Sequence, residues 1–366
     1  MKLYFIANAR MPTDKAHGIH IAKMCEAFIE SGIELTLIVP RRGTHASLKQ
    51  YYRLRVDVPT VVLPALGSLY RRGRVGFVLS SCVFMLGYFF YILGRRLRGE
   101  RFVLYSVDMD TFSFFPMTFF GRPTIEMHTP KASTTLTRFF FRRARTVATN
   151  ALIADELVRT FGIKRDRLCV EPNGVDESLL GAPLSKEEAR QRLGLPLEDP
   201  FALYLGRFYR WKELDILSGV ARDATLPIRL LGGTREEYER VTGAGGGQLL
   251  FAGECPPSEV PLWLAAADIL LIVGSAKNES SYRYTTPMKV YEYFAARRPV
   301  VASATPALRS FIPEDVVTWY KPDDARSLCD AIRAAQSAPV ERAAAEALMH
   351  TWSVRAERIL SFMSHD

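Results

Sequence analysis

The sequence lacks any pair of cysteines at the spacing of a metal site or a redox motif. Its five cysteines are scattered singly, and their odd number is unlike a disulfide framework. We therefore expect a reducing compartment. The first residues enter an apolar strand at once, without the basic and then apolar segment of a secretion signal, which favours a cytoplasmic location.

Low-complexity segments are absent too, as are the zinc-ligand spacings, basic helical repeats and aromatic motifs of nucleic-acid-binding proteins. We therefore expect no nucleic-acid partner. The apolar share of 48% is typical of a chain that is globular throughout. A length of 366 residues is long for one core and suits two α/β domains.

The net charge of +9 comes from one half of the chain. Residues 1–180 hold 26 Lys and Arg against 15 Asp and Glu, whereas residues 181–366 hold 22 against 24. Such asymmetry indicates an anionic partner of the first half. We favour an anionic membrane surface or a lipid-linked acceptor, with a merely solvated basic face as the alternative.

Apolar strand-like runs alternate with helical segments from end to end, which predicts parallel, doubly wound sheets. The pattern restarts with a helix over 186–193. We therefore predict an α/β chain with two Rossmann-like domains that face across a cleft. The first covers residues 1–180, with a C-terminal helix of about 350–366 packed back on it, and the second covers residues 181–349.

Residues 75–94 form an uncharged, mostly apolar run that is long enough to cross a membrane. Arginines flank both ends, so the run encodes no orientation. Gly76, Ser80, Gly87 and Gly94 fall near one helical face, which suits close packing on a sheet. We expect a buried or membrane-surface helix rather than a true span.

The most informative stretch is residues 283–296. It follows an apolar strand over 269–273, begins as a loop rich in hydroxyl groups, and continues as a helix with Lys289 at its start and Glu292 one turn later. A polar loop and helix start after a strand favour an anionic ligand such as phosphate. A nearby carboxylate can hold sugar hydroxyls, so the pattern predicts a nucleotide-sugar site.

A second motif opens the second predicted domain. A strand ends at Gly206, which allows a ligand to approach the backbone, and two cations follow at Arg207 and Lys212. The forked donors of arginine and the point charge of lysine suit a diphosphate. By itself the motif also fits an ordinary basic loop anchored by Trp211.

The order and spacing of these motifs resemble those of the family 4 glycosyltransferases, which are retaining enzymes of the GT-B fold. The matching segments are Gly-Arg-x4-Lys at 206–212, Glu-Pro-Asn-Gly-Val-Asp at 171–176, Ala-Ala-Asp-Ile-Leu at 266–270, Thr-Thr-Pro-Met-Lys-Val-Tyr-Glu-Tyr at 285–293, Arg-Pro-Val-Val-Ala-Ser at 298–303 and His-Gly-Ile-His-Ile-Ala-Lys at 17–23. The resemblance covers nearly the whole chain. It implies transfer of a hexose or N-acetylhexosamine from a nucleoside diphosphate sugar, UDP or GDP in the first instance. No metal or other cofactor is required, because the cations stabilise the leaving diphosphate.

The resemblance also implies roles for individual residues. Arg207 and Lys212 would hold the donor pyrophosphate, and Glu292 would bind the ribose hydroxyls. Gly18 would reach the donor phosphate from the first domain, unless it is a plain helix-start glycine. His128 would touch the donor sugar or the acceptor, unless it is a structural strand-end histidine. The loop that presents backbone N–H groups to the donor consists of Tyr284, Thr285, Thr286, Pro287 and Met288, of which Pro287 has no N–H and shapes the turn.

One departure from the family pattern leaves the activity open. Relatives usually carry two glutamates with seven residues between them, and here Glu292 is the second while Tyr284 stands at the first position. A non-catalytic nucleotide-sugar-binding subunit is therefore an alternative. A GT-B sugar-nucleotide epimerase is another, which would need carboxylates and histidines converging on the cleft.

Two short patterns resemble metal sites. His17 and His20 lie three residues apart near a helix start, and Asp108-Met109-Asp110 resembles the Asp-x-Asp motif of another glycosyltransferase fold. Neither has supporting context, so we expect no metal at either. The basic first half and residues 75–94 favour a lipid-linked or polysaccharide acceptor, cell-envelope glycan synthesis, and a peripheral position on the inner face of the cell membrane.

Overall fold

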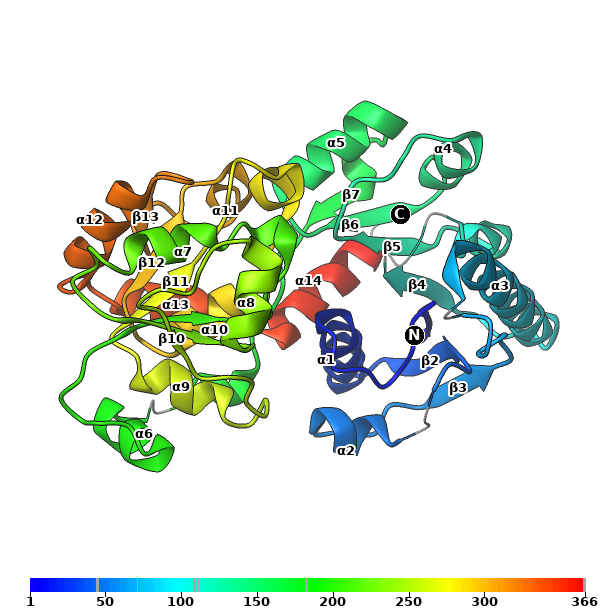
Figure 1. Ribbon diagram of the computed structural model, residues 1–366. Helices are drawn as coiled ribbons and strands as arrows, with labels where there is room; N and C mark the ends of the chain where they lie inside the picture. Colours follow the sequence, from blue (N-terminus) through cyan, green and yellow to red (C-terminus); the bar gives the residue numbers. More distant parts are fainter. Residues whose placement is uncertain (44–45, 71, 108–109, 111, 182–183, 365–366) are drawn as a thin grey trace. The chain divides into compact units, whose positions relative to one another are not determined.

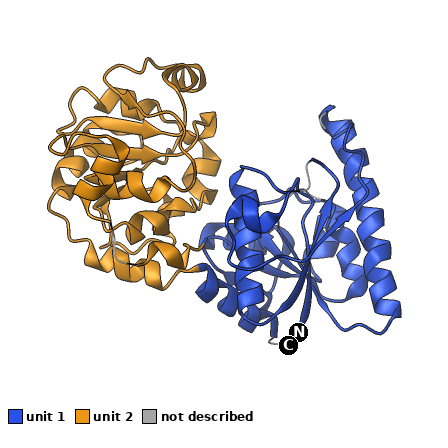
Figure 2. Ribbon diagram, turned by 90° about the horizontal axis from the view of Figure 1, so that it is seen from below, with its two compact units in different colours: residues 1–173, 352–366 blue, residues 174–351 orange. Residues whose placement is uncertain are grey.

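The computed structural model describes residues 1–366 except 44–45, 71, 108–109, 111, 182–183 and 365–366. The chain folds into two compact units (Figure 2). Unit 1 comprises residues 1–173 and 352–366, and unit 2 comprises residues 174–351. The sequence places the boundary at 180/181, within the short connecting segment that the structure assigns to unit 2.

Unit 1 is a parallel α/β layer structure (Figure 1). Its strands are β1 (Lys2–Ile6), β2 (Glu34–Pro40), β3 (Thr60–Leu63), β4 (Val103–Val107), β5 (Thr124–Met127), β6 (Arg145–Ala148) and β7 (Leu168–Val170). Its helices are α1 (Ala16–Glu30), α2 (Leu48–Tyr52), α3 (Gly73–Leu97), η1 (Phe115–Phe120), α4 (Thr135–Phe141), α5 (Ala151–Phe161), η2 (Arg165–Arg167) and α14 (Trp352–Ser364).

The seven strands of unit 1 pair in the order β3-β2-β1-β4-β5-β6-β7. In β1 both faces are buried, because Leu3, Tyr4, Phe5 and Ile6 are each at most 2% exposed. Continuous burial of this kind is typical of a parallel strand covered by helices on both sides. Strand order reverses between β1 and β4, so the carboxyl ends of β1 and β4 lie beside the usual ligand position of such sheets.

Side-chain caps explain where several helices begin. Thr134 and Thr137 form a reciprocal capping box at the start of α4, and Asn150 accepts a hydrogen bond from the Ile153 N–H at the start of α5. Gly162 ends α5 with a left-handed backbone, which glycine adopts without a steric penalty.

Unit 2 repeats the architecture with a smaller sheet. Its strands are β8 (Ala202–Leu205), β9 (Ile228–Leu231), β10 (Leu250–Phe251), β11 (Ile269–Ile272), β12 (Val300–Ser303) and β13 (Thr318–Tyr320). Its helices are η3 (Glu177–Leu179), α6 (Lys186–Leu193), η4 (Arg210–Lys212), α7 (Asp215–Val220), α8 (Arg235–Thr242), α9 (Val260–Ala266), η5 (Ser280–Tyr284), α10 (Lys289–Ala295), α11 (Pro306–Arg309), α12 (Ala325–Ala335) and α13 (Glu341–Leu348).

The sheet of unit 2 has the order β10-β9-β8-β11-β12-β13. Alternate residues of its central strands pack in two hydrophobic cores, one on each face of the sheet, as the two-residue period of a strand requires. Leu203 and Leu270 pack in the core that contains Phe294 of α10, whereas Tyr204 and Leu271 pack in the core on the opposite face. The strand order reverses between β8 and β11, and this places the expected ligand position beyond the end of β8.

Helix α3 extends the predicted apolar run at both ends. Its inner face includes the buried residues Gly76 and Ser80, as the pattern predicts, but no atom outside the helix lies within 4 Å of a side-chain position at Gly94. Arg42 donates hydrogen bonds to the hydroxyls of Ser80 and Ser81, at 3.0 and 3.2 Å. The inner face is therefore fixed to unit 1 by polar contacts as well as by packing.

Candidate functional site

Two glycines mark the carboxyl edge of the unit 2 sheet. Gly206 follows β8 with φ of 136°, and Gly232 follows β9 with φ of 132°. Both values lie in the region that favours glycine. A Cβ atom on Gly232 would lie 2.5 Å from the carbonyl carbon of Gly206, so the two backbones approach too closely for any side chain. The sequence therefore leaves bare backbone where the strand order reverses.

Two lysine side chains converge on this backbone. Lys212 ends η4, and Lys289 is the first residue of α10. A Cβ atom on Gly206 would lie 2.5 Å from the Lys289 Nζ and 3.4 Å from the Lys212 Nζ. We call Gly206, Gly232, Lys212 and Lys289 the lysine cradle.

The surroundings of the lysine cradle are poor in negative charge. Lys212 donates to the Arg207 carbonyl at 2.8 Å and to the Tyr204 hydroxyl at 3.2 Å, and the Lys289 Nζ lies 4.7 Å from the centre of the Tyr204 ring. Among the described residues, neither ammonium has a carboxylate within ion-pair distance. These two cations are therefore stabilised by dipoles and an aromatic face rather than by counter-ions.

Burial shifts the pKa of both lysines downward. It lowers the pKa of Lys212 to about 8. It also lowers the pKa of Lys289 well below its ordinary range, and the charge of Lys212 adds to that effect. Two desolvated cations beside a half-buried backbone without side chains are unfavourable until an anion joins them. The arrangement is suited to a phosphate or diphosphate group.

Glu292 lies on α10 one turn beyond Lys289. Burial raises its pKa to about 7, while Lys289 opposes the shift and Asp176 adds to it. The carboxyl group borders a cavity of about 170 Å³, which Leu264 and Ala265 of α9 also line. A carboxylate beside such a cavity, which has both polar and apolar lining residues, can accept hydrogen bonds from the hydroxyls of a ligand that enters it.

The structure brings some of the predicted residues of unit 2 together and leaves others apart. Lys212 is in the cradle, and Glu292 is linked to it electrostatically through Lys289. Arg207 contributes its backbone carbonyl to the cradle, while its guanidinium is about half exposed and lies 3.9 Å from Glu254. Its role as a phosphate ligand stays a prediction.

The predicted donor loop runs from η5 into α10. The Tyr284 hydroxyl donates to Glu279 at 3.4 Å, and the Thr285 hydroxyl donates to the Ser280 carbonyl at 2.8 Å. The remaining loop residues, Thr286, Pro287 and Met288, connect this turn to Lys289. Contacts of this loop with a donor stay predictions.

Sequence reasoning missed the role of Lys289. It noted this lysine at the start of a helix but assigned it no function, because nothing in the local pattern shows which way its side chain points. The usable signal was its position, three residues before the predicted ribose-binding Glu292 and directly after the predicted donor loop.

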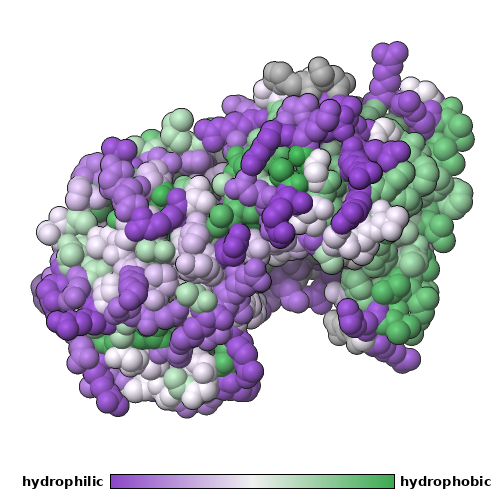
Figure 3. All heavy atoms as spheres, turned by 90° about the horizontal axis from the view of Figure 1, so that it is seen from above, coloured by the Kyte–Doolittle hydropathy of each residue, from purple (hydrophilic) through white to green (hydrophobic). Residues whose placement is uncertain are grey.

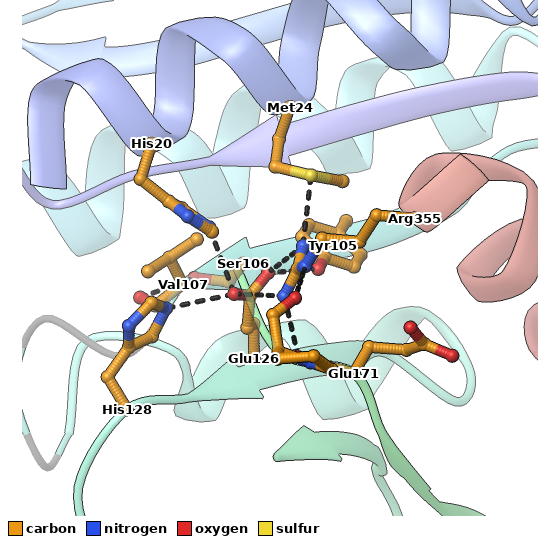
Figure 4. Close-up of polar contacts among 10 residues, drawn as sticks. His20, Met24, Tyr105, Ser106, Val107, Glu126, His128, Glu171 and Arg355 are labelled. Carbon is orange, nitrogen blue, oxygen red and sulfur yellow. Dashed lines mark hydrogen bonds and ion pairs between the residues drawn. The ribbon is translucent and has the colours of Figure 1, made fainter. Parts of the chain in front are cut away.

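Unit 1 contains a second polar centre, built around the fully buried carboxylate of Glu126 on β5 (Figure 4). Arg355 of α14 donates to both of its oxygens, at 2.6 and 3.2 Å, and the Tyr105 hydroxyl donates at 2.6 Å. Two histidines approach the same oxygen: the Nε2 atoms of His20 and His128 each lie 2.9 Å from Glu126 Oε1. We call these five residues the Glu126 cluster.

Charges in the Glu126 cluster are strongly coupled. Burial would raise the pKa of Glu126, but Arg355 and His20 hold it well below its usual range. Burial lowers the pKa of His20 to about 4, so this ring is neutral near neutral pH. Arg355 keeps its proton because the attraction of Glu126 outweighs the cost of burial. Glu126 and Arg355 thus form a buried ion pair.

The remaining predicted residues of unit 1 have clear local surroundings. His128 follows β5 and is partly exposed, at 31% of its side chain. Gly18 lies in the first turn of α1, where a Cβ atom would be 2.5 Å from both Thr13 Cγ2 and the Tyr52 hydroxyl. Close packing is enough to require glycine there, and its predicted phosphate contact stays a prediction.

The two predicted weak metal patterns have different outcomes. Asp108 and Met109 lie outside the described residues, whereas the Asp110 carboxylate accepts hydrogen bonds from Asn8 and from the N–H groups of Phe112 and Ser113. Asp110 therefore closes a turn. His20 does not form the pair with His17 that the spacing suggested. Instead, one possible ligand atom from each of His20, Glu126 and His128 lies within 4.8 Å of the others.

Comparisons with known proteins agree with this geometry. Residues 199–337, which contain the lysine cradle and Glu292, match the family described as glycosyl transferases group 1. A D-inositol 3-phosphate glycosyltransferase of Catenulispora acidiphila is 30% identical over 242 residues, covering 59% of this chain and 56% of that protein. A Bacillus subtilis protein with the provisional name teichuronic acid biosynthesis glycosyltransferase TuaC is 30% identical over 165 residues, covering 44% and 40%.

Solved structures match over the whole length. A glycosyltransferase of Rickettsia africae aligns with a TM-score of 0.74 at 13% identity, covering 100% of this chain and 99% of that one. The fold is GT-B. Anabaena HepE, in complex with UDP and glucose, aligns with a TM-score of 0.70 at 15% identity, covering 100% and 99%. At these identities the structural likeness concerns the fold. The sequence matches span about half the length of the curated relatives.

Proposed function

We propose that this GT-B protein is a retaining glycosyltransferase. It transfers a hexose or N-acetylhexosamine from a UDP- or GDP-sugar to a lipid-linked or polysaccharide acceptor of the cell envelope. The observation that carries the proposal is the lysine cradle, because two unneutralised ammonium groups beside bare backbone suit a diphosphate. It lies in the segment that matches the glycosyl transferases group 1. A relative named for teichuronic acid biosynthesis supports the cell-envelope context.

The chemistry would rest on charge stabilisation and positioning. As the bond between sugar and diphosphate breaks, Lys212 and Lys289 stabilise the negative charge that builds on the leaving diphosphate. Glu292 holds the ribose hydroxyls, and the acceptor hydroxyl attacks on the face that the diphosphate leaves. A donor phosphate oxygen takes the proton of that hydroxyl.

The first experiment is a thermal-shift screen against UDP-, GDP-, ADP- and dTDP-sugars. We expect one nucleotide to raise the melting temperature, and we expect Lys212→Ala to remove the shift because it deletes one of the two cations. Lys321→Ala, which removes an exposed lysine of unit 2, is the matched control. If no nucleoside diphosphate stabilises the protein at millimolar concentration, the proposal fails.

Two alternatives are separated from it by products. A glycosyltransferase slowly hydrolyses its donor when no acceptor is present. A non-catalytic binder, which Tyr284 at the usual glutamate position would favour, binds the donor but leaves it intact. An epimerase interconverts nucleotide sugars and requires reactive groups that reach the sugar. In the Glu126 cluster, Glu126 and His20 are fully buried, so among its carboxylate and two histidines only His128 can reach a ligand.

Donor binding is expected to depend on pH through Lys212. Its pKa of about 8 in the free protein means that the ammonium loses its proton as the pH rises past 8, so a diphosphate must then recapture that proton. We expect affinity for the nucleoside diphosphate to fall by up to about tenfold per pH unit above pH 8. Calorimetry in two buffers of different ionisation enthalpy measures the coupled proton uptake, and equal heats in both would contradict the mechanism.

We also propose that unit 1 binds the inner face of the cell membrane through α3. The described chain contains one helix that is long and apolar enough to span a bilayer, and it is α3. Its outer face carries exposed apolar residues at helical spacing: Val75, Leu79, Leu86, Phe90 and Leu97. Figure 3 shows apolar side chains gathered along this edge of unit 1. Exposed Arg72, Arg74, Arg96 and Arg98 lie at its two ends.

This pattern is typical of a helix that lies flat in the membrane interface, because one face is apolar, the ends are cationic and the other face is fixed to protein. Leu86 and Phe90 are 59% and 63% exposed. We expect Leu86→Glu with Phe90→Glu to abolish co-sedimentation with phosphatidylglycerol vesicles at low salt. The matched control carries the same two glutamates at Leu348 and Met349, which are similarly exposed in unit 2. A wild-type protein that stays off anionic vesicles would overturn the proposal.

A further inference from the structure

His128, a partly exposed histidine of unit 1, is hydrogen-bonded to a carboxylate that cannot reach a substrate. The His128 Nε2 lies 2.9 Å from Glu126 Oε1, and Glu126 is fully buried while His128 is partly exposed. Figure 4 shows the Nε2 edge of the ring directed at Glu126 and the other ring nitrogen directed away from it. The ring therefore has one edge committed to the protein and one edge available.

The orientation of the Glu126 carboxylate is fixed by donors from other elements. Arg355 of α14 contacts both carboxylate oxygens and also donates its Nε–H to the Pro172 carbonyl at 2.6 Å. The Tyr105 hydroxyl of β4 donates to Glu126 Oε2 at 2.6 Å. With its lone pairs occupied in this way, the carboxylate has little freedom to rotate, and the bond to His128 has a defined direction.

The charge of Glu126 decides which nitrogen of His128 carries the hydrogen. The guanidinium of Arg355 keeps the carboxyl group ionised, so Glu126 has no proton to donate. The bond between the two side chains requires an N–H at His128 Nε2. In the neutral ring Nδ1 then has a lone pair, which makes it a hydrogen-bond acceptor.

His20 supports this arrangement by packing. Its ring meets His128 edge-on at 4.8 Å between centres and meets Trp352 of α14 at 5.3 Å. Its own Nε2 lies close to Glu126 without the alignment of a hydrogen bond. A neutral, fully buried ring at this place excludes water from the bond between Glu126 and His128.

We propose that Glu126 is a positioning residue that holds His128 as its Nε2–H tautomer and so presents Nδ1 as an acceptor to a hydroxyl of the sugar or of the acceptor. Arg355 fixes Glu126 for this task, which makes the C-terminal helix part of the catalytic apparatus. The inference rests on the proposed glycosyl transfer for its role, but the tautomer is a property of the protein alone.

A divalent cation is the competing occupant, because His20, Glu126 and His128 could supply three ligand atoms within 4.8 Å. Arg355 opposes this use, since its guanidinium already neutralises the carboxylate at 2.6 Å and would be left beside a second positive charge in a buried place. Metal binding at these three residues would therefore contradict the inference.

The direct test is nitrogen-15 NMR of the full-length protein labelled at histidine, with the His128 signals assigned by comparison with His128→Gln. We expect a protonated-type shift at Nε2 and an unprotonated-type shift at Nδ1. An Nδ1–H tautomer in the wild-type protein would overturn the inference. So would a stoichiometric shift of the His20 and His128 signals on addition of Zn²⁺, because it would assign these nitrogens to a metal.

Kinetics of two variants test the catalytic consequence. Glu126→Gln should lower kcat by about tenfold or more with little change in the KM for the donor, and should mix the His128 tautomers. Glu171→Gln is the matched control, because Glu171 is a buried carboxylate that pairs with Arg358 and, in the part of the chain that the structure describes, does not contact His128. Equal kcat values for the two variants would contradict the positioning role.

The outcomes separate this inference from the proposed function. If the wild-type tautomer is as expected but no nucleotide sugar is consumed, the proposed glycosyl transfer fails while the assigned tautomer of His128 stands. If transfer is found and His128 has the other tautomer, the function stands and the positioning role fails. If Glu126→Gln does not fold, the wild-type spectrum still decides the tautomer.

Discussion

We expect Lys289→Met to weaken binding of a nucleoside diphosphate by about 10- to 100-fold and at the same time to raise the melting temperature of the free protein. The loss of affinity is the usual size for a charge-assisted hydrogen bond to a phosphate. The gain in stability, about 1 kcal/mol, follows because methionine fills the space beside Gly206 without a desolvated charge facing Lys212. A residue kept for structure alone would not change the two quantities in opposite directions.

Isothermal titration calorimetry and differential scanning calorimetry measure the two effects. The matched control is Lys321→Met, which removes an exposed lysine 3.7 Å from Asp324 and should change neither quantity appreciably. Unchanged affinity in Lys289→Met would remove Lys289 from the donor site. A fall in melting temperature would show that Lys289 stabilises the free fold instead.

We expect Arg355→Met to destabilise the protein by about 3–5 kcal/mol, because it leaves the Glu126 carboxylate buried without its counter-ion. Arg358→Met is the matched control on the same helix. Arg358 is about one-third exposed and lies 3.5 Å from Glu171, so its loss should cost about 0–1 kcal/mol. Urea unfolding measures both. A loss below about 1 kcal/mol for Arg355→Met would contradict the buried ion pair.

A second substitution separates charge from packing. Glu126→Leu in the Arg355→Met background removes the unpaired carboxylate and should restore most of the lost stability. If the double variant is as unstable as Arg355→Met, the loss arises from the packing of α14.

The same cluster sets the acid stability of unit 1. His20 has a pKa of about 4 in the folded protein against an ordinary value of 6.5, so the unfolded chain binds this proton first and stability falls as the pH drops from 6.5 to 4. Glu126 has a lowered pKa, so its contribution is fully present above its unfolded value and is lost as the pH falls further. His20→Phe should reduce the slope of melting temperature against pH between 6.5 and 4.

The sequence predicts most of the fold because its strands are buried on both faces and are therefore continuous apolar runs. The predicted helix over 186–193 has the bounds that the structure shows, and the predicted strand over 269–273 agrees with β11 (Ile269–Ile272) to within one residue. Strand β13 (Thr318–Tyr320) was missed, since three residues at the edge of a sheet give too short a pattern.

The candidate sites could be predicted only where their residues are close together in the sequence. Gly206 and Lys212 lie in one short loop, so their proximity is a local property. Lys289 joins them from a different strand connection, and Arg355 reaches Glu126 across more than half of the chain. No local pattern encodes such pairings, because they arise from sheet order and from the return of α14 to unit 1.

The most direct test of the central claim is a crystal structure of the protein with UDP or GDP bound, whichever the thermal-shift screen selects. The account predicts the diphosphate against the backbone of Gly206 and Gly232, within hydrogen-bond distance of both Lys212 and Lys289, with the ribose hydroxyls at Glu292. A diphosphate bound away from these two lysines would contradict it.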